Sequence, residues 1–269
     1  MSRVPDIKGR WAVVTGASSG IGLRFATELA SMGCNVFAVS NQEHELGQTA
    51  SALMKNFPGV KVGTLFLDLA SEKAADAVVD ALNERKIVPL LLINNAGIFD
   101  FRRVSHLSSR RLDLYIDLHI RAVTHLCRAV GGMMAENGGG YILNMSSMSC
   151  WMPMPGIAMY SATKAYIRAF SRALRIELKP RGVSVTVACP GGIATDLFGL
   201  PPKLQKLGVS VGALATPEKF VYKALQRTFR RKAQYVNGLV NRAAIVAVAS
   251  LPEWARGLIR TKLLDRLDP

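Results

Sequence analysis

Residues 11–22 read WAVVTGASSGIG, an apolar run that ends in three closely spaced glycines. The run predicts a buried strand, and the residues after it predict a turn followed directly by a helix. In such a turn Gly16 permits the tight bend, Gly20 lets the backbone approach a pyrophosphate, and Gly22 lets the helix pack closely on the sheet. The N-terminus of the helix then faces the phosphates, so this stretch predicts a nucleotide-binding turn.

The same alternation of apolar strands and amphipathic helices continues along the chain. The expected strands are 11–16, 35–40, 60–69, 89–97, 140–147, 183–192 and 234–238. The expected helices are 21–32, 42–56, 72–84, 109–135 and 160–178. Strands this apolar are buried on both faces, which predicts an α/β fold with a doubly wound, Rossmann-type parallel sheet and helices on both faces. One domain, 1–238, is expected to carry this sheet, followed by a helical C-terminal extension, 239–269.

The composition is that of a folded globular protein, with 49% hydrophobic and 20% charged residues in 269. No apolar run approaches the roughly 20 residues of a membrane span, and residues 1–16 lack the apolar core of a secretory signal. The four cysteines, at 34, 127, 150 and 189, are scattered and form no CxxC pair. We therefore expect reduced thiols, no metal site and a cytoplasmic location.

The chain is strongly basic. Its formal net charge is +15, and residues 219–269 hold 11 Lys or Arg against three acids. Such a charge suits nucleic acid, an anionic membrane surface or an anionic ligand such as a phosphate, and a merely solvated surface is the simplest interpretation. The sequence shows no aromatic interleaving and no known nucleic-acid-binding module, so we expect no nucleic acid partner.

Further motifs follow the glycine turn in order. They are N94-N95-A96-G97 after a strand, Ser147 at a strand end, Y160-S161-A162-T163-K164 on a helix, and P190-G191-G192-I193-A194-T195 after the last buried strand. Together with the spacing GxxxGxG of the turn, they closely resemble the short-chain dehydrogenase/reductase family over residues 11 to about 196. The resemblance implies hydride transfer between a nicotinamide cofactor and a carbonyl or secondary alcohol.

Hydride transfer to a carbonyl leaves an alkoxide that must be protonated. A phenol with a pKa of ~10 exchanges protons poorly at neutral pH, but a neighbouring cation favours the phenolate and lowers that pKa. Lys164 lies four residues after Tyr160 on one helix face and can be that cation, and Ser147 can donate a hydrogen bond to the substrate oxygen. The resemblance assigns the same roles: Tyr160 as acid/base, Lys164 as its modulator and Ser147 as the residue that orients the substrate.

The resemblance also implies a set of cofactor-binding residues. Asn95 and Gly97 would line the adenosine-ribose side, Asp68 would meet the adenine, and Ile193 and Thr195 would meet the carboxamide end. Asp68 also ends a strand, where its carboxylate could instead cap the next helix. The full expected set is Gly16, Ser18, Ser19, Gly20, Ile21, Gly22, Ser40, Asn41, Asp68, Leu69, Asn95, Ala96, Gly97, Tyr160, Lys164, Pro190, Gly191, Ile193 and Thr195.

The end of the second strand bears on the choice between NAD and NADP. An acid there would bind the ribose 2′-hydroxyl and repel a 2′-phosphate, but the chain has Ser40-Asn41. The base with which the family usually binds that phosphate is also missing, both at Asn41 and at Ser19. Without the repelling acid, and in a very basic protein, we expect NADP, with NAD as the alternative.

Residues 116–125, IDLHIRAVTH, hold two of the four histidines. His119 and His125 are six residues apart, about 120° around a helix, so they cannot bind one metal together, and His125 is expected to be a surface or packing residue. His119 falls where the family places the asparagine of its catalytic set. Its imidazole could keep a proton relay to Lys164 with a new pH dependence, or it could only fill space while the backbone carbonyl does the work.

The family places its substrate lid at 196–217, and this segment is apolar and rich in Pro and Gly. Met152, Met154 and Met159 lie nearby in sequence. These features favour a hydrophobic substrate such as a 3-oxoacyl chain or a steroid, unless the methionines belong to the core.

About thirty residues follow the last expected strand. With this extension the chain resembles a subgroup of the family that includes acyl-chain and steroid reductases. Ile259, Leu263 and Leu267 fall on one helical stripe beside Arg256 and Arg260, although apolar side chains also occur on the other side. Such a helix could touch an anionic membrane peripherally, or it could pack on the domain or across a dimer interface. We expect a homo-oligomer, and the extension favours a dimer.

Two functions remain in view. The first is an NADP(H)-dependent oxidoreductase of a hydrophobic ketone or alcohol. The second is a catalytically weak nucleotide-binding sensor or interaction protein of the same fold. The intact Ser147, Tyr160 and Lys164 favour the enzyme.

Overall fold

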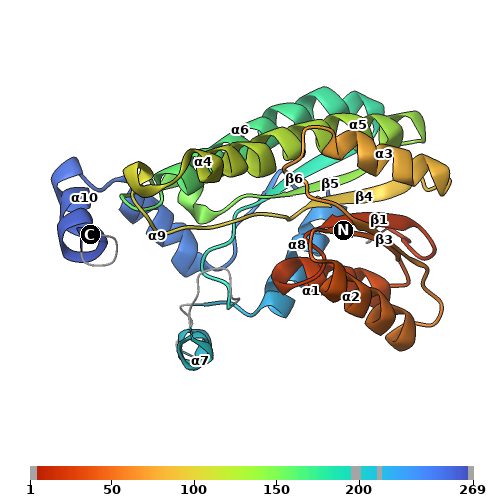
Figure 1. The fold of residues 1–269 in the computed structure, drawn as a ribbon, viewed down its shortest axis with the longest axis horizontal. Helices are drawn as coiled ribbons and strands as arrows, with labels where there is room; N and C mark the ends of the chain where they lie inside the picture. The colour runs from red at the N-terminus through yellow and green to blue at the C-terminus, as the bar shows by residue number, and fades with distance from the viewer. Residues whose placement is uncertain (1–4, 195–200, 211–213, 266–269) are drawn as a thin grey trace.

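The computed structural model describes residues 5–194, 201–210 and 214–265. Within these residues the centre is a seven-stranded parallel sheet with the order β3-β2-β1-β4-β5-β6-β7 (Figure 1). The strands are β1 (Trp11–Thr15), β2 (Asn35–Ser40), β3 (Val62–Phe66), β4 (Pro89–Asn94), β5 (Gly140–Met145), β6 (Val183–Ala188) and β7 (Gln234–Tyr235). The predicted doubly wound, Rossmann-type sheet is confirmed.

Helices cover both faces of the sheet (Figure 1). One face carries α1 (Gly20–Ser31), α2 (Glu43–Asn56) and α8 (Pro217–Phe229), and the other carries α3 (Ala74–Glu84), α5 (Ala122–Glu136) and α6 (Ala158–Leu178). Because successive strand residues point to opposite faces, Val14 packs with Phe25 of α1 while its neighbour Val13 packs with Leu126 of α5. This two-sided burial explains why the strands are apolar at almost every position.

Three strand ends and one helix differ from the sequence expectation in a way that matters for the site. Strands expected at 60–69, 89–97 and 183–192 end at Phe66, Asn94 and Ala188, so the residues that follow them leave the sheet and are free to form loops. The helix expected over 109–135 is interrupted. It comprises α4 (Ser109–Ile116), a π-helical turn (Asp117–Arg121) and α5.

The C-terminal extension is helical. It contains α9 (Leu239–Ala249), α10 (Glu253–Ile259) and a π-helical turn (Arg260–Leu264). Helix α9 contacts the short 3-10 helix η3 (Met148–Trp151), and an ion pair joins Arg103 to Asp265. In the part of the chain that the structure describes, no helix combines the length and the apolar character that a membrane crossing would need.

Candidate active site

A cavity of about 910 Å³ opens at the carboxyl ends of the strands. In a doubly wound sheet ligands bind at this edge, where the strand order reverses, here between β1 and β4. Most of the predicted site residues line the cavity. They are Gly16, Ser18, Ser19, Gly20, Ile21, Ser40, Asn41, Asp68, Leu69, Asn95, Ala96, Gly97, Ser147, Tyr160, Lys164, Pro190, Gly191 and Ile193.

Two of the described predicted residues, Gly22 and His119, do not line it. A Cβ atom on Gly22 would lie 2.0 Å from the carbonyl oxygen of Gly16 and 2.6 Å from Nδ2 of Asn95, so this glycine lets α1 approach both the glycine turn and the end of β4. His119 lies behind Gly97, where a Cβ atom on Gly97 would come within 2.9 Å of Nε2. Thr195 lies outside the described residues.

The glycine turn has the form of a phosphate cradle. Gly16 and Gly20 have φ angles of 63° and 53°, in the left-handed region that favours glycine. Ser19 precedes α1, and its side chain makes no capping hydrogen bond to the helix N-terminus. A Cβ atom on Gly20 would meet nothing within 4 Å, so the backbone is open there. These features fit the pyrophosphate of a dinucleotide.

Polar, uncharged groups gather at the end of β2. The hydroxyls of Ser18 and Ser40 are 2.8 Å apart, and Ser18 donates a hydrogen bond to Oε1 of Gln42 at 2.7 Å. Gln42 lines the cavity but was not predicted, although its position directly after Asn41 could have indicated it. None of the described lining residues of this corner, 40–42, is acidic or basic.

Two of the expected cofactor residues also hold the local backbone. Oδ1 of Asp68 accepts a hydrogen bond from the backbone N of Ala70 at 3.0 Å, so its carboxylate secures the turn after β3. The Asn95 carboxamide donates from Nδ2 to the carbonyl oxygen of Thr15 at 3.0 Å and thereby ties the end of β4 to the glycine turn. Both side chains therefore shape the cavity wall as well as facing it.

Ser147, Tyr160 and Lys164 converge on the cavity from β5 and α6. Ser147 lies two residues after the end of β5, and its hydroxyl lowers the pKa of the Tyr160 phenol. The Lys164 ammonium donates to the carbonyl oxygen of Met145 at 3.0 Å and lies 5.5 Å from the centre of the Tyr160 ring. The sequence spacing thus brings the three groups together as expected.

The ionisation of Tyr160 differs from the expectation. Burial raises its pKa to about 12, and the hydrogen bond to Ser147 offsets this rise only in part. Burial also lowers the pKa of Lys164 to about 8. Desolvation, and not the neighbouring lysine, therefore sets the direction of the shift in the Tyr160 pKa, and the phenol keeps its proton at neutral pH.

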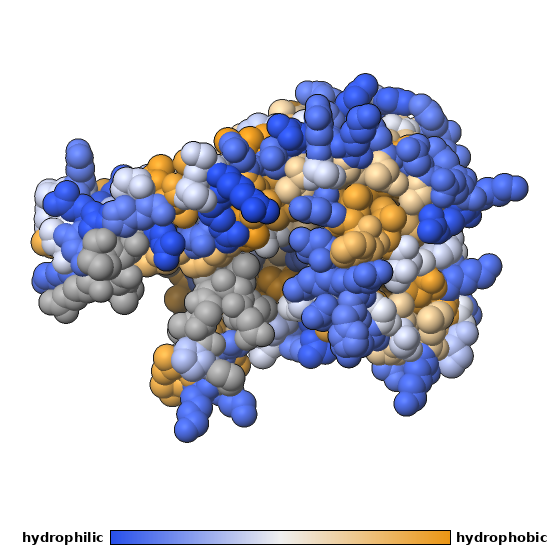
Figure 2. All heavy atoms as spheres, viewed as in Figure 1, coloured by the Kyte–Doolittle hydropathy of each residue, from blue (hydrophilic) through white to orange (hydrophobic). Residues whose placement is uncertain are grey.

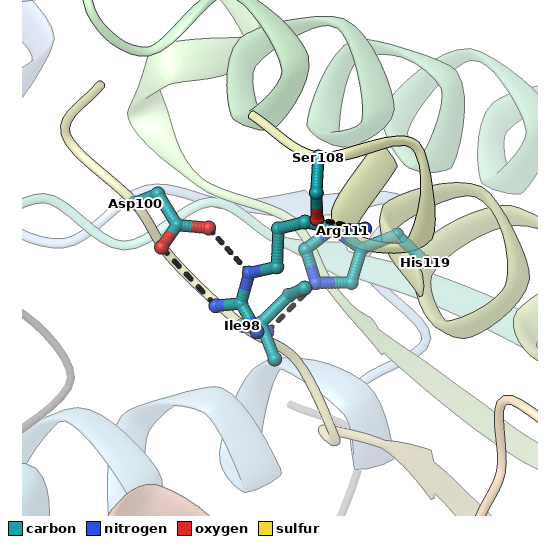
Figure 3. A network of polar contacts seen from close by, with 5 residues as sticks. All are labelled: Ile98, Asp100, Ser108, Arg111 and His119. Carbon is teal, nitrogen blue, oxygen red and sulfur yellow. Dashed lines mark hydrogen bonds and ion pairs between the residues drawn. The ribbon is translucent and has the colours of Figure 1, made fainter. Parts of the chain in front are cut away.

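His119 occupies the π-helical turn between α4 and α5 and is fully buried. Its Nε2 atom is 3.0 Å from the backbone N of Ile98 (Figure 3). Its Nδ1 atom is 2.9 Å from the hydroxyl of Thr163. The side chain therefore touches the wall of the cavity from behind. His125, expected to be a surface or packing residue, is exposed.

Helix α4 contributes residues that the sequence interpretation missed. Arg110, Asp113, Leu114 and Asp117 line the cavity. They are spaced as i, i+3, i+4 and i+7, which places them on one helix face. That spacing was available in the sequence and could have indicated these residues.

The described part of the expected lid, 201–210 and 214–217, contributes nothing to the cavity wall, and neither do Met152, Met154 and Met159. Its helix α7 (Pro202–Ser210) carries the exposed side chains of Leu204 and Leu207, and apolar surface is visible over this helix in Figure 2. The segment after α7 returns to the site, because Ala215 and Ile193 pair as a parallel bridge.

Within the described residues no group of three or more His, Cys, Asp or Glu side chains is placed to hold a metal ion. All four cysteines are free thiols.

Comparison with known proteins gives concordant matches. The profile of the family described as short chain dehydrogenase matches residues 10–201. The human very-long-chain 3-oxoacyl-CoA reductase is 32% identical over 251 residues, which make up 91% of this chain and 77% of that protein. The inactive hydroxysteroid dehydrogenase-like protein 1 of Pongo abelii is 36% identical over 201 residues, 73% of this chain and 60% of that protein.

Among solved structures, the L-sorbose reductase of Gluconobacter frateurii, complexed with NADPH and L-sorbose, is similar with a TM-score of 0.77 at 27% identity, covering 87% of this chain and 97% of that one. A short-chain dehydrogenase from Sphingobium yanoikuyae in complex with NADPH has a TM-score of 0.76 at 27% identity, and the match covers 91% of this chain and 97% of that one. With a family profile across most of its length and a human relative aligned over nine-tenths of it, this chain belongs to the short-chain dehydrogenase/reductase family.

Proposed function

We propose that the chain reduces a hydrophobic ketone, such as a 3-oxoacyl chain or a steroid, with NADPH as the hydride donor. The observation that carries the proposal is the convergence of Ser147, Tyr160 and Lys164 on one cavity, with the phenol kept protonated by burial. Relatives named as 3-oxoacyl-CoA reductases support the acyl class. Leu114 and Leu118, which line the cavity, support an apolar substrate.

Each of the three residues has a task that its position supports. Ser147 donates a hydrogen bond to the substrate oxygen and polarises the carbonyl. Bound NADPH would supply the hydride. Tyr160 holds its proton at neutral pH and transfers it to the developing alkoxide. The Lys164 ammonium, anchored on Met145, stabilises the negative charge that remains on the tyrosine oxygen.

The test of the function is Tyr160→Phe, which removes the proton donor and keeps the ring. The variant should bind NADPH with unchanged affinity and lose at least ~99% of its turnover, since general acid catalysis contributes about 10²- to 10⁴-fold. Turnover is measured on a panel of acyl, steroid and small ketones. Tyr222→Phe, on the exposed face of α8, is the matched control and should behave as the wild type. Retention of activity in Tyr160→Phe would exclude the proposed mechanism.

The NADP preference rests on the neutral groups at Ser18, Ser40 and Gln42, which can hydrogen-bond a 2′-phosphate without repelling it. Solved relatives hold NADPH. Asn41→Asp places a carboxylate in this corner and should weaken NADPH binding by about tenfold relative to NADH, because ~1.4 kcal/mol of repulsion is a factor of ten. Fluorescence titration with both cofactors measures the ratio. Asn41→Ser controls for loss of the amide, and an unchanged ratio in Asn41→Asp would place the phosphate elsewhere.

A second candidate, a nucleotide-binding protein without turnover, is favoured by one finding. A relative that is 36% identical over 73% of this chain is named inactive. This candidate predicts NADPH binding by the wild type with no turnover on any ketone of the panel, so the same experiment separates the two functions.

A further inference from the structure

The imidazole of His119 uses both ring nitrogens to join two other elements. Nε2 contacts the backbone N of Ile98, in the segment that leaves β4 and lines the cavity. Nδ1 contacts the hydroxyl of Thr163, on the first turns of α6. Figure 3 shows the contact with Ile98 beside the neighbouring Asp100–Arg111 ion pair.

The hydrogen-bond partners fix where the protons lie. A backbone N–H can only donate, so Nε2 accepts from Ile98 and carries no proton. The neutral ring then has its proton on Nδ1 and donates it to Oγ1 of Thr163. The Thr163 hydroxyl in turn donates to the carbonyl oxygen of Tyr160 at 3.0 Å. The result is a directed chain from Ile98 through His119 and Thr163 to the backbone of Tyr160.

A second proton on the ring would be unfavourable. It would break the hydrogen bond from Ile98, and it would place a cation close to two others, Lys164 on α6 and Arg111 on α4. Burial, then Lys164, then Arg111 hold the pKa of His119 well below its usual value. Asp100, which pairs with Arg111 at 2.7 Å, does not reverse this effect.

Aromatic rings complete the enclosure. The Tyr115 ring meets the imidazole edge to face with centroids 5.4 Å apart, and the Tyr160 ring lies 6.1 Å away. The imidazole is therefore held on its nitrogens by hydrogen bonds and on its faces by packing. An amide N–H is not a proton source at neutral pH, so the chain of hydrogen bonds has no group from which a proton could enter at Ile98.

We propose that His119 is a positioning residue, a permanently neutral link that couples the cavity wall at Ile98 to the backbone of Tyr160 and carries no proton between them. Of the two roles open from the sequence, proton relay and space filling, neither describes this arrangement. The link sets the relative position of the segment that would face the cofactor and the helix that bears the phenol. The expected effects on turnover rest on the proposed function, but the position of the ring proton does not.

The two ends of the link can be broken separately. Thr163→Val removes the hydroxyl while leaving the bond between His119 and Ile98, so kcat should fall by about tenfold with NADPH affinity within about twofold of wild type. His119→Asn keeps a donor near Thr163 but cannot reach Ile98, so NADPH affinity should fall by about tenfold. Thr163→Ser retains the hydroxyl and should restore kcat. A role in general packing would change both quantities together in both variants, and that result would overturn the proposal.

The ring proton is tested directly by nitrogen NMR on protein with labelled histidine. We expect a protonated Nδ1 and a bare Nε2 with no titration between about pH 6 and 9. A proton on Nε2, or titration near the ordinary histidine pKa, would overturn the proposal. If no ketone is reduced, the proposed function fails, whereas the spectrum and the NADPH affinities of the wild type and His119→Asn still decide the role of His119.

Discussion

Burial moves both ionisable residues of the catalytic set toward their neutral forms. The pKa of Tyr160 rises to about 12, and that of Lys164 falls to about 8. At neutral pH the phenol carries its proton and can donate it. A phenol that acts as a base would first have to lose that proton. On the proposed function, this protonated phenol is ready to donate its proton to the alkoxide that carbonyl reduction forms.

The buried lysine also has a consequence for stability. Its pKa falls from 10.5 to about 8, which at about 1.4 kcal/mol per unit destabilises the fold by about 3 kcal/mol below pH 8. Lys164→Met removes this penalty but loses the hydrogen bond to Met145, worth about 1 kcal/mol. The inactive variant should therefore be about 2 kcal/mol more stable than the wild type at pH 7.

The pH dependence provides the check. Because folding lowers the pKa of Lys164, the buried lysine costs no stability above its unfolded pKa of 10.5. The cost grows as the pH falls from 10.5 and is complete below about pH 8. The advantage of Lys164→Met should thus be constant below pH 8 and disappear toward pH 10.5. Urea unfolding at pH 7, 8.5 and 10 measures the difference, and an advantage that does not depend on pH would show that desolvation of the lysine is not its cause.

At the level of single elements, the glycine turn joins β1 to α1 with no room for a side chain at Gly22. A Cβ atom there would lie 2.0 Å from Gly16 and 2.6 Å from the Asn95 carboxamide. Gly22→Ala should therefore destabilise the protein by about 1–3 kcal/mol and weaken NADPH binding, because the turn must move. Denaturant unfolding and fluorescence titration measure the two effects.

The chain offers a matched control in Gly47. This residue lies within α2, away from the helix ends and on its exposed face, and a Cβ atom there would meet nothing within 4 Å. Gly47→Ala should stabilise the protein by about 0.5–1 kcal/mol and leave NADPH binding unchanged. If Gly22→Ala behaved like Gly47→Ala, the close approach of α1 to the turn would not matter for cofactor binding.

The elements whose signal is local could be predicted from the sequence. The alternation of strands and helices and the meeting of Ser147, Tyr160 and Lys164 follow from alternating patterns and fixed spacings, and the structure has them. The contacts of His119 in the π-helical turn at 117–121 could not be predicted, because His119 accepts a hydrogen bond from Ile98 and donates one to Thr163, and both partners are distant in sequence. The same holds for the Tyr160 pKa, which depends on burial by the whole fold.

Across the whole molecule, the C-terminal extension leaves apolar surface uncovered. Helix α9 has no buried residue, and Leu239, Val240 and Val246 are 79%, 73% and 67% exposed. The sequence predicted an apolar stripe at Ile259, Leu263 and Leu267, but these side chains lie outside what the structure describes. Among the described side chains of the extension, these three residues of α9 form an exposed apolar face, and Trp254 and Leu258 of α10 are exposed as well.

Basic side chains flank this face. Lys223, Arg227, Arg230 and Arg242 line a cavity of about 230 Å³ beside the start of α9, and no acid is among its described lining residues. Such a surface repels a second copy of itself, whereas each base near an anionic membrane contributes about 1 kcal/mol of attraction. An apolar helix beside such bases suits the interface of an anionic bilayer. Charge thus favours the membrane over the dimer as the partner of α9.

We predict that the protein floats with vesicles containing anionic lipid and not with neutral vesicles, and that about 0.5 M salt weakens this binding because it screens the bases. Val246→Asp, which charges the apolar face, should reduce the bound fraction severalfold. Ile176→Asp, equally exposed on α6, is the matched control and should not. If the vesicles bind none of the protein, the membrane prediction fails, and sedimentation at rising protein concentration tests for a dimer. A dimer that Val246→Asp dissociates would assign the apolar face of α9 to a second copy of the chain.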